Sequence, residues 1–155
     1  MSFLQGVKVC PFLPSDKPSC CCHNAVATVQ SVMMWLLSGV AASGVNLYVI
    51  GGWSGCSCLS LCECYNTDTK TWSPIADLNV GRSQVAVCAL EDGRIVAVGG
   101  RDAWNCTNTV EMYDPRENKW KLLPALAIAR RGAGVACFNS KSCNVQHLIM
   151  TCRCK

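Results

Sequence analysis

Residues 46–72, NLYVIGGWSGCSCLSLCECYNTDTKTW, are repeated in outline by residues 94–120, RIVAVGGRDAWNCTNTVEMYDPRENKW. In each copy an apolar run ends in two glycines, and an acidic residue, a tyrosine and a tryptophan follow at fixed distances. An internal repeat of this length indicates that the fold is built from successive similar units. Each matched residue recurs 48 positions later, and the pairs include Gly51 and Gly99, Gly52 and Gly100, Cys58 and Cys106, Glu63 and Glu111, Tyr65 and Tyr113, and Trp72 and Trp120.

Each unit is predicted to contain four short β-strands. In the second unit, residues 82–93 and 94–100 are apolar runs that end in turn residues or glycines. Residues 108–115 alternate apolar and polar side chains, and residues 118–124 carry the tryptophan and end at a proline. These patterns are typical of strands joined by turns. Four strands in a unit of about 50 residues are typical of a propeller blade, so the predicted fold class is all-β.

The repeated glycines and aromatic residues have structural explanations. A glycine pair lets the chain turn tightly where a side chain would collide with neighbouring backbone. Tyrosine and tryptophan can fill the space between twisted sheets, provided that their polar groups find hydrogen-bond partners. The predicted structural residues are Gly51, Gly52, Tyr65, Trp72, Gly99, Gly100, Tyr113 and Trp120.

The runs LYVIGG and CECYNTDTKTW, and their counterparts IVAVGG and VEMYDPRENKW, resemble kelch repeats. This resemblance rests on three features: paired glycines, an acidic residue two positions before a tyrosine, and a tryptophan about seven residues further on. It covers residues 37–138, approximately. It implies a partial kelch β-propeller with about two four-stranded blades and the first strand of a third.

The repeats suggest how the chain is organised. The start of the first unit departs from the repeat pattern, because Met34 stands where the other units have arginine. The last residues carry no kelch features, and the glycine pair of a third unit would fall on His147 and Leu148. We expect a leader of unclear, disordered structure at 1–33, repeat 1 at 34–80, repeat 2 at 81–128, the start of repeat 3 at 129–138 and a divergent tail at 139–155.

Two blades and one strand do not close a propeller, which needs about four to eight blades. The open sheet edges that result predict self-association. We therefore expect the chain to be a truncated or alternatively spliced piece of a larger kelch protein.

Fourteen cysteines among 155 residues raise the alternative of a metal-binding or redox-sensing protein. Four of them lie within residues 56–65. A shift of 48 residues places Cys62 and Cys64 on Val110 and Met112, at alternate positions of a strand. Cysteine at such positions behaves as a small buried apolar residue. We therefore expect no metal and no cofactor, and the metal or redox protein stays open as the alternative.

Residues 25–50 are uncharged and long enough to span a bilayer. Gln30, Asn46 and the strand-and-turn pattern argue against a membrane segment, so a fragment anchored through residues 25–45 is only the second alternative. The first residues contain prolines and no continuous apolar run, which does not fit a secretory signal peptide. We expect a cytoplasmic protein, with the cytoskeleton or the nucleus as other possible locations.

Composition and motifs argue against catalysis and against nucleic-acid binding. The net charge of +4 comes from scattered lysines and arginines without a basic face. The sequence has no nucleophile-elbow, zinc-protease or phosphate-binding motif. Its two histidines, His23 and His147, lie outside the repeats. The chain is therefore predicted not to be an enzyme.

What remains is a module that binds a protein partner. The resemblance implies that ligands dock on one face of the propeller, against residues after the glycine pair and residues that open the innermost strand. It also implies actin or a ubiquitin-ligase substrate as the class of partner, and the arginines suit an acidic peptide segment. In the alternative interpretation, the arginines are solvated charges and the tryptophans shield a blade edge. The candidate contacts are Trp53, Ser54, Arg82, Ser83, Gln84, Arg101, Asp102, Arg130 and Arg131.

Overall fold

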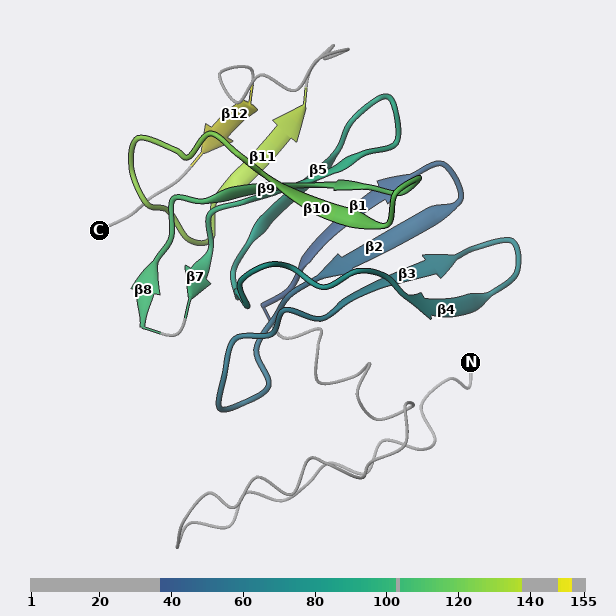
Figure 1. The fold of residues 1–155 in the computed structure, drawn as a ribbon, viewed down its shortest axis with the longest axis horizontal. Coiled ribbons are helices and arrows are strands. Elements are labelled where there is room, and N and C mark those ends of the chain that lie inside the picture. Colours follow the sequence, from purple (N-terminus) through teal and green to yellow (C-terminus); the bar gives the residue numbers. More distant parts are fainter. Residues whose placement is uncertain (1–36, 103, 138–147, 152–155) are drawn as a thin grey trace, which may run out of the picture.

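Two antiparallel four-stranded sheets form most of the computed structural model, which describes residues 37–102, 104–137 and 148–151 (Figure 1). These residues form strands, turns and loops, and none of them is helical. Blade 1 has the strand order β1 (Gly39–Ser43), β2 (Asn46–Ile50), β3 (Cys62–Asn66) and β4 (Thr71–Pro74). Blade 2 has the order β5 (Ala86–Ala89), β6 (Ile95–Val98), β9 (Val110–Asp114) and β10 (Lys119–Leu123). The predicted all-β fold with two four-stranded blades is confirmed.

Two further hairpins complete the described chain. Strands β7 (Arg101–Asp102) and β8 (Asn105–Cys106) pair within the loop between β6 and β9. Strand β11 (Gly134–Cys137) opens the third unit and pairs antiparallel with β12 (Leu148–Thr151). The sequence predicts only the first strand of this unit, so β12 is an addition. It begins at the position where a shift of 48 residues would place a glycine pair, which is why the repeat pattern does not reveal it.

The repeat length of 48 residues does not extend to the first strand of each blade. Gly39 of β1 pairs with Ile50, whereas Ala86 of β5 pairs with Val98. Ile50 and Val98 are 48 residues apart, but Gly39 and Ala86 are only 47 apart. The hairpin of blade 1 is therefore one residue shorter than that of blade 2 between these paired positions.

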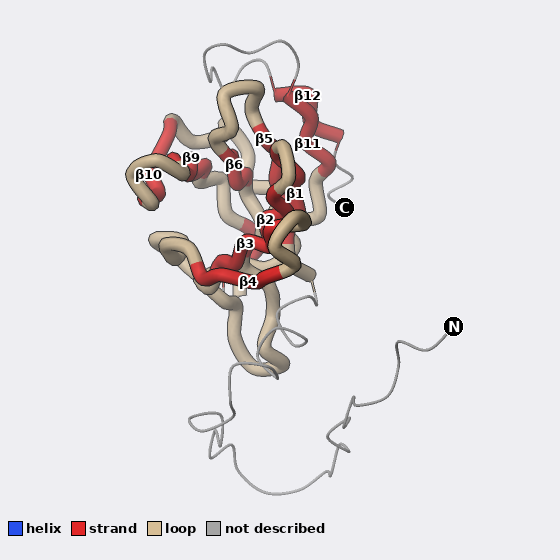
Figure 2. Tube along the Cα trace, turned by 90° about the vertical axis from the view of Figure 1, so that its right-hand side faces the viewer, coloured by secondary structure: helices blue, strands red, loops and turns tan. Residues whose placement is uncertain are grey.

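The main hydrophobic core lies between the two blades, which pack face to face (Figure 2). Trp120 and Tyr113 extend from blade 2 into this core and have their polar groups satisfied, as the sequence predicts. The Trp120 Nε1–H donates to the carbonyl of Ala76 at 2.8 Å, and the Tyr113 hydroxyl donates to Oδ1 of Asn118 at 2.9 Å. The buried members of the core are Ala41, Tyr48, Ile50, Cys62, Leu78, Val85, Ile95, Ala97, Tyr113 and Trp120.

A second core lies on the opposite face of blade 2, towards the third unit. Val96, Val98 and Val110 are its most deeply buried members, and Val135 of β11 packs against them. Each face of blade 2 is therefore covered, which explains why all four residues of β6 are buried.

The first glycine of each pair occupies a left-handed backbone conformation, with φ of 63° at Gly51 and 59° at Gly99. A Cβ atom on Gly51 would lie 2.4 Å from the carbonyl oxygen of Arg82, and one on Gly99 would lie 2.5 Å from that of Arg130. The same two carbonyls accept hydrogen bonds from the next residues, Gly52 and Gly100. At each glycine pair the blade therefore lies directly against the linker that leads to the next unit, at a distance that leaves no room for a side chain on the first glycine.

The part of the possible membrane segment that the structure describes, residues 37–45, consists of β1, two residues before it and the turn that follows it. Among the described residues, no helix is long and apolar enough to cross a membrane. The expected leader at 1–33 and most of the expected tail at 139–155 lie outside the described residues.

Candidate functional site

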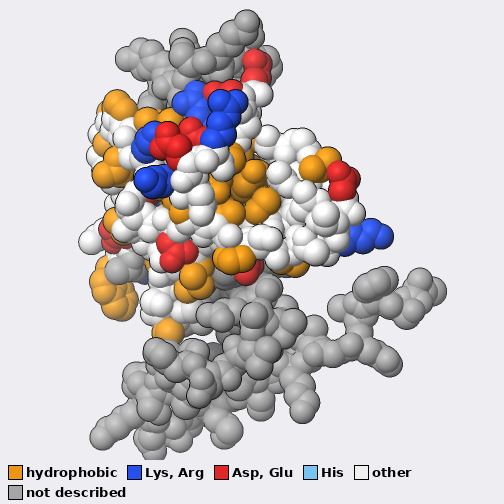
Figure 3. Space-filling model, turned by 45° about the vertical axis from the view of Figure 1, so that its right-hand side comes forward, with side chains coloured by type: hydrophobic (Ala, Val, Ile, Leu, Met, Phe, Trp, Pro, Cys, Tyr) orange, Lys and Arg blue, Asp and Glu red, His pale blue; other side chains and the backbone are white. Residues whose placement is uncertain are grey.

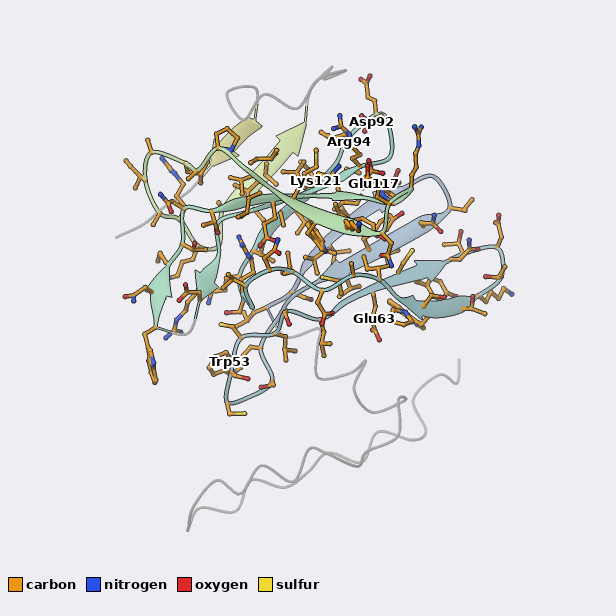
Figure 4. The ribbon with its side chains drawn as sticks, in the orientation of Figure 1. Trp53, Glu63, Asp92, Arg94, Glu117 and Lys121 are labelled. Atoms are coloured by element: carbon orange, nitrogen blue, oxygen red, sulfur yellow. The ribbon has the colours of Figure 1, made fainter. Side chains whose placement is uncertain are left out.

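The loops that follow the glycine pairs and the linkers that lead into the next blade meet at one end of the blades. The backbones of Ser83 and Arg101 form a two-way bridge, with N–H to O distances of 2.9 and 2.8 Å. The carbonyl of Gln84 accepts the N–H of Gly132 at 2.9 Å. The structure therefore brings together the two linkers and the β7–β8 hairpin (Figure 1), which projects on the same side as the loop that carries Trp53 (Figure 4).

Three of the predicted arginines remain accessible at this end. Arg101 and Arg130 are half-buried and Arg131 is exposed. The Nε–H of Arg101 is buried and has no hydrogen-bond partner among the described residues. A buried donor without a partner is costly. The Nε–H of Arg82 is in the same position, but only Arg101 combines such a donor with a partly exposed side chain, which makes it the strongest candidate for a ligand contact. Asp102 follows it on β7 and is also half-buried.

Arg82 does not lie at the surface as expected, since its exposed fraction is 0%. Its Nη1 donates to the carbonyls of Gly99 at 2.9 Å and Thr109 at 3.1 Å, and its Nη2 forms an ion pair with Glu111. Burial lowers the pKa of Arg82, and the charge of Glu111 opposes that change. Ser83 is buried as well. The expectation that these two side chains contact a partner is corrected, because both are buried inside the described part of the molecule.

Glu111 has the structural role that its recurrence in the repeat suggests. Besides the guanidinium of Arg82, its carboxylate accepts the backbone N–H of Asn79 at 3.0 Å and the side-chain amide of Asn79. Glu111 is fully buried, so these charge-assisted hydrogen bonds replace its contacts with water.

The loop after the first glycine pair closes on itself. Trp53 forms an isolated β-bridge with Cys58, and the N–H of Ser57 donates to Oγ of Ser54 at 3.1 Å. Trp53 is half-buried and lies in this projecting loop (Figure 4). Ser54 is therefore engaged in stabilising the turn, whereas Trp53 keeps part of its ring surface accessible.

Trp104 is a candidate that sequence reasoning missed. It lies in the turn between β7 and β8, and its exposed fraction of 85% is the highest among the exposed large hydrophobic residues of the described chain. Exposed tryptophans are enriched at the centres of protein interfaces. Its position shortly after Arg101 and Asp102 could have indicated a contact residue. The repeat alignment did not, because a shift of 48 residues pairs Trp104 with a cysteine, Cys56.

The cysteines in blade 1 mainly contribute to packing and to local hydrogen bonds. Cys62 is buried in the core between the blades, and Cys64 packs against that core, which supports their interpretation as apolar strand residues. The Sγ–H of Cys58 donates to the carbonyl of Arg101 at 3.1 Å. Within the described ranges, no cluster of three His, Cys, Asp or Glu side chains could hold a metal ion. The run from Cys20 to His23 lies outside those ranges.

Burial raises the pKa of Cys62 to about 12, so this thiol stays protonated at neutral pH. The thiolate is the reactive form of cysteine. We expect iodoacetamide at pH 8 to modify exposed Cys56 much faster than Cys62 in the folded chain, as measured by mass spectrometry of peptides over time. Unfolding in urea should remove the difference. Equal rates in the folded protein would contradict the burial of Cys62 and would favour a redox role.

The opposite end of the blades has a different character. A hollow of about 470 Å³ lies there between the turns of the two blades, and Asn46, Tyr48, Asp92 and Arg116 are among its lining residues. Charged side chains gather on this side of the molecule (Figures 3 and 4). Opposite charges there are paired, with Arg94 Nη2 at 2.6 Å from Asp92 and Lys121 Nζ at 2.9 Å from Glu117. None of the predicted contact residues lines this hollow.

Comparison with known proteins gives a consistent result. A family model described as "Kelch motif" matches residues 34–79 and 81–127. The human "Kelch-like protein 4" is 46% identical over 81 residues, which are 52% of this chain and 11% of that protein. The human "Kelch repeat and BTB domain-containing protein 13" is 36% identical over 104 residues, 66% of this chain and 22% of that protein.

A zebrafish (Danio rerio) protein, "Kelch-like ECH-associated protein 1B", is 34% identical over 93 residues, which are 57% of this chain and 16% of that protein. In each of these cases the chain spans less than a quarter of the length of the relative.

Proposed function

The chain belongs to the kelch family, and from this premise we propose that it is a non-catalytic module that binds a protein partner. The contact surface is the end of the blades formed by the linkers and the β7–β8 hairpin. The observation that carries this proposal is the buried Nε–H of half-buried Arg101, which has no hydrogen-bond partner in the described ranges and lies at that end together with Arg130 and Arg131.

The chemistry of this end favours an acidic segment of a partner. A carboxylate can accept two parallel hydrogen bonds from a guanidinium, which gives both affinity and a defined orientation. Trp104 offers an exposed apolar anchor in the same hairpin as Arg101. Aromatic residues and arginines are the side chains that most often dominate binding energy. Trp53, Gln84 and Asp102 complete the proposed surface.

The partner classes implied by the resemblance stay part of the proposal. They are actin and the acidic peptide of a protein destined for ubiquitination, in the cytoplasm or in association with the cytoskeleton or the nucleus. We propose neither a nucleic acid nor a membrane as a partner.

Selection of short random peptides displayed on phage tests this proposal directly. We expect peptides selected on the purified chain to be enriched in Asp and Glu. Binding of a synthetic selected peptide should fall roughly tenfold for each of the substitutions Arg101→Ser and Arg131→Ser, because a hydrogen bond to a charged group is lost. Trp104→Ala should weaken binding by a comparable factor.

The matched control is Arg116→Ser at the opposite end of the blades, which removes the same charge and should leave binding unchanged. Selected peptides without acidic residues would contradict the proposal. So would peptides whose affinity depends on Arg116 as strongly as on Arg101.

A further inference from the structure

The outer face of blade 1, on the side away from blade 2, repeats a surface that is covered elsewhere in the molecule. The strand register shows which residues share this face. One row of cross-strand neighbours is Val40, Val49 and Glu63, and a second row is Leu47, Tyr65 and Trp72. Alternate residues of a strand point to opposite faces, so these side chains point away from Ala41, Tyr48 and Cys62 in the core between the blades. Their counterparts in blade 2 are Val87, Ala97, Glu111, Ile95, Tyr113 and Trp120.

In blade 2, this face is covered by blade 1 and by the linker of residues 75–82. Ala76 accepts the indole N–H of Trp120, and Leu78 is buried against the aromatic residues. The backbone and side chain of Asn79 donate to Glu111. Arg82 then inserts its guanidinium between Glu111 and the carbonyls of Gly99 and Thr109. The linker therefore contains an apolar residue followed four positions later by an arginine.

Blade 1 contains the acceptors of the same arginine site. Gly51 and Leu61 are the counterparts of Gly99 and Thr109, and in both blades the glycine N–H donates to the carbonyl of the second residue at 3.0 Å. Glu63 is the counterpart of Glu111, and its Oε2 is buried without a hydrogen-bond partner among the described residues. Burial raises the pKa of Glu63 above its ordinary value. Figure 4 places Glu63 on the side of β3 that faces away from blade 2.

The chain has no arginine at the position that would fill this site from the preceding sequence. A shift of 48 residues from Arg82 leads to Met34, and the shift of 47 that applies to the first strand leads to Trp35. Neither side chain carries a positive charge. Blade 1 therefore retains the acidic group, and no cationic partner for it is found in the part of the chain that the structure describes.

We propose that the outer face of blade 1 binds an extended segment of a partner protein whose arginine pairs with Glu63 and the carbonyls of Gly51 and Leu61. The segment has the pattern of residues 75–82, with an apolar side chain four positions before the arginine. Charge complementarity selects this occupant: the buried Oε2 of half-buried Glu63 has no partner among the described residues, and a guanidinium would relieve the cost of that unmet acceptor. The exposed fractions of Val40, 52%, and Trp72, 36%, show that apolar surface is available beside it.

One difference between the blades bears on affinity. Asn118, which accepts the N–H of Ala76 at 2.8 Å in blade 2, has Lys70 as its counterpart in blade 1. A bound segment therefore lacks this one backbone contact, and the interaction with Glu63 contributes a larger share of the binding energy.

A peptide copied from the chain itself, IADLNVGR (residues 75–82), is a suitable probe. In an NMR titration of the full chain, we expect saturable shifts at Glu63, Tyr65 and Trp72. Replacing the peptide's arginine with glutamine should weaken binding roughly tenfold, and the protein variant Glu63→Gln should do the same. The two changes together should be no worse than either alone, because they remove the same contact. The pKa of Glu63 should fall when the peptide binds.

Asp68→Asn, in the exposed turn between β3 and β4, removes an equal charge from the same blade and serves as the matched control. The Glu63→Gln protein should keep the urea midpoint of the parent or exceed it, because Oε2 of Glu63 has no hydrogen-bond partner to lose among the described residues. Absence of saturable binding, or equal affinity for the arginine and glutamine peptides, would overturn the proposal. Dimerisation in sedimentation experiments that E63Q abolishes would also overturn it, since the occupant would then be a second copy of the chain.

Discussion

Replacing Glu111 with glutamine is expected to lower the free energy of unfolding by about 3–5 kcal/mol, because it leaves the buried guanidinium of Arg82 without its counter-charge. Arg82 is fully enclosed and contacts Gly99 and Thr109 as well as Glu111. Those two carbonyls cannot neutralise its charge. The amide of glutamine also accepts the hydrogen bonds from Asn79 less strongly than a carboxylate does. Urea-induced unfolding followed by far-UV circular dichroism measures the loss.

Two further variants test whether the unpaired buried charge causes the loss of stability in E111Q. Glu117→Gln removes the same carboxylate from an exposed ion pair with Lys121, and it should change stability by no more than about 0.5 kcal/mol. The double variant Arg82→Met with Glu111→Leu should be more stable than E111Q, because neither charge is then buried alone. A loss for E111Q as small as that for E117Q would show that the pair does not hold the linker to blade 2.

The sequence predicts the blades well because their pattern depends on residues with one dominant physical role. Gly51 and Gly99 recur because backbone approaches them too closely for a side chain. Tyr113 and Trp120 recur because large amphipathic rings fill the space between the blades. Such features are local in sequence and repeat at a fixed distance, so one chain is enough to reveal them.

The candidate site was harder to predict because exposure depends on contacts between distant residues. Arg82 and Arg130 are equivalent in the repeat, yet Arg82 is buried and Arg130 is half-buried. Arg82 is buried because it pairs with Glu111, 29 residues further along the chain, and a contact at that distance cannot be read from the repeat pattern. Trp104 shows a related difficulty. Its exposure follows from the β7–β8 hairpin, which has only two residues in each strand and no strong strand pattern.

Replacing Gly51 with alanine is expected to destabilise the fold by about 3 kcal/mol or more. A left-handed conformation costs an alanine roughly 1–2 kcal/mol relative to glycine. The remainder comes from collision, since a Cβ atom would lie only 2.4 Å from the carbonyl oxygen of Arg82. Either Gly51 or the linker must move, and movement of the linker withdraws Arg82 from Glu111. Thermal or urea unfolding of the variant measures the total effect.

Gly44→Ala separates the two contributions. Gly44 has a similar φ of 57°, but no atom lies within 4 Å of the position of its Cβ. Its replacement should therefore cost only the conformational part, roughly 1–2 kcal/mol. Hydrogen exchange gives a second criterion: the Gly52 N–H, which donates to Arg82 at 2.8 Å, should lose protection in the Gly51 variant and keep it in the Gly44 variant. Equal effects of the two substitutions would mean that the close approach to the linker does not constrain the glycine pair. The arginine site would then depend on the Arg82–Glu111 pair alone.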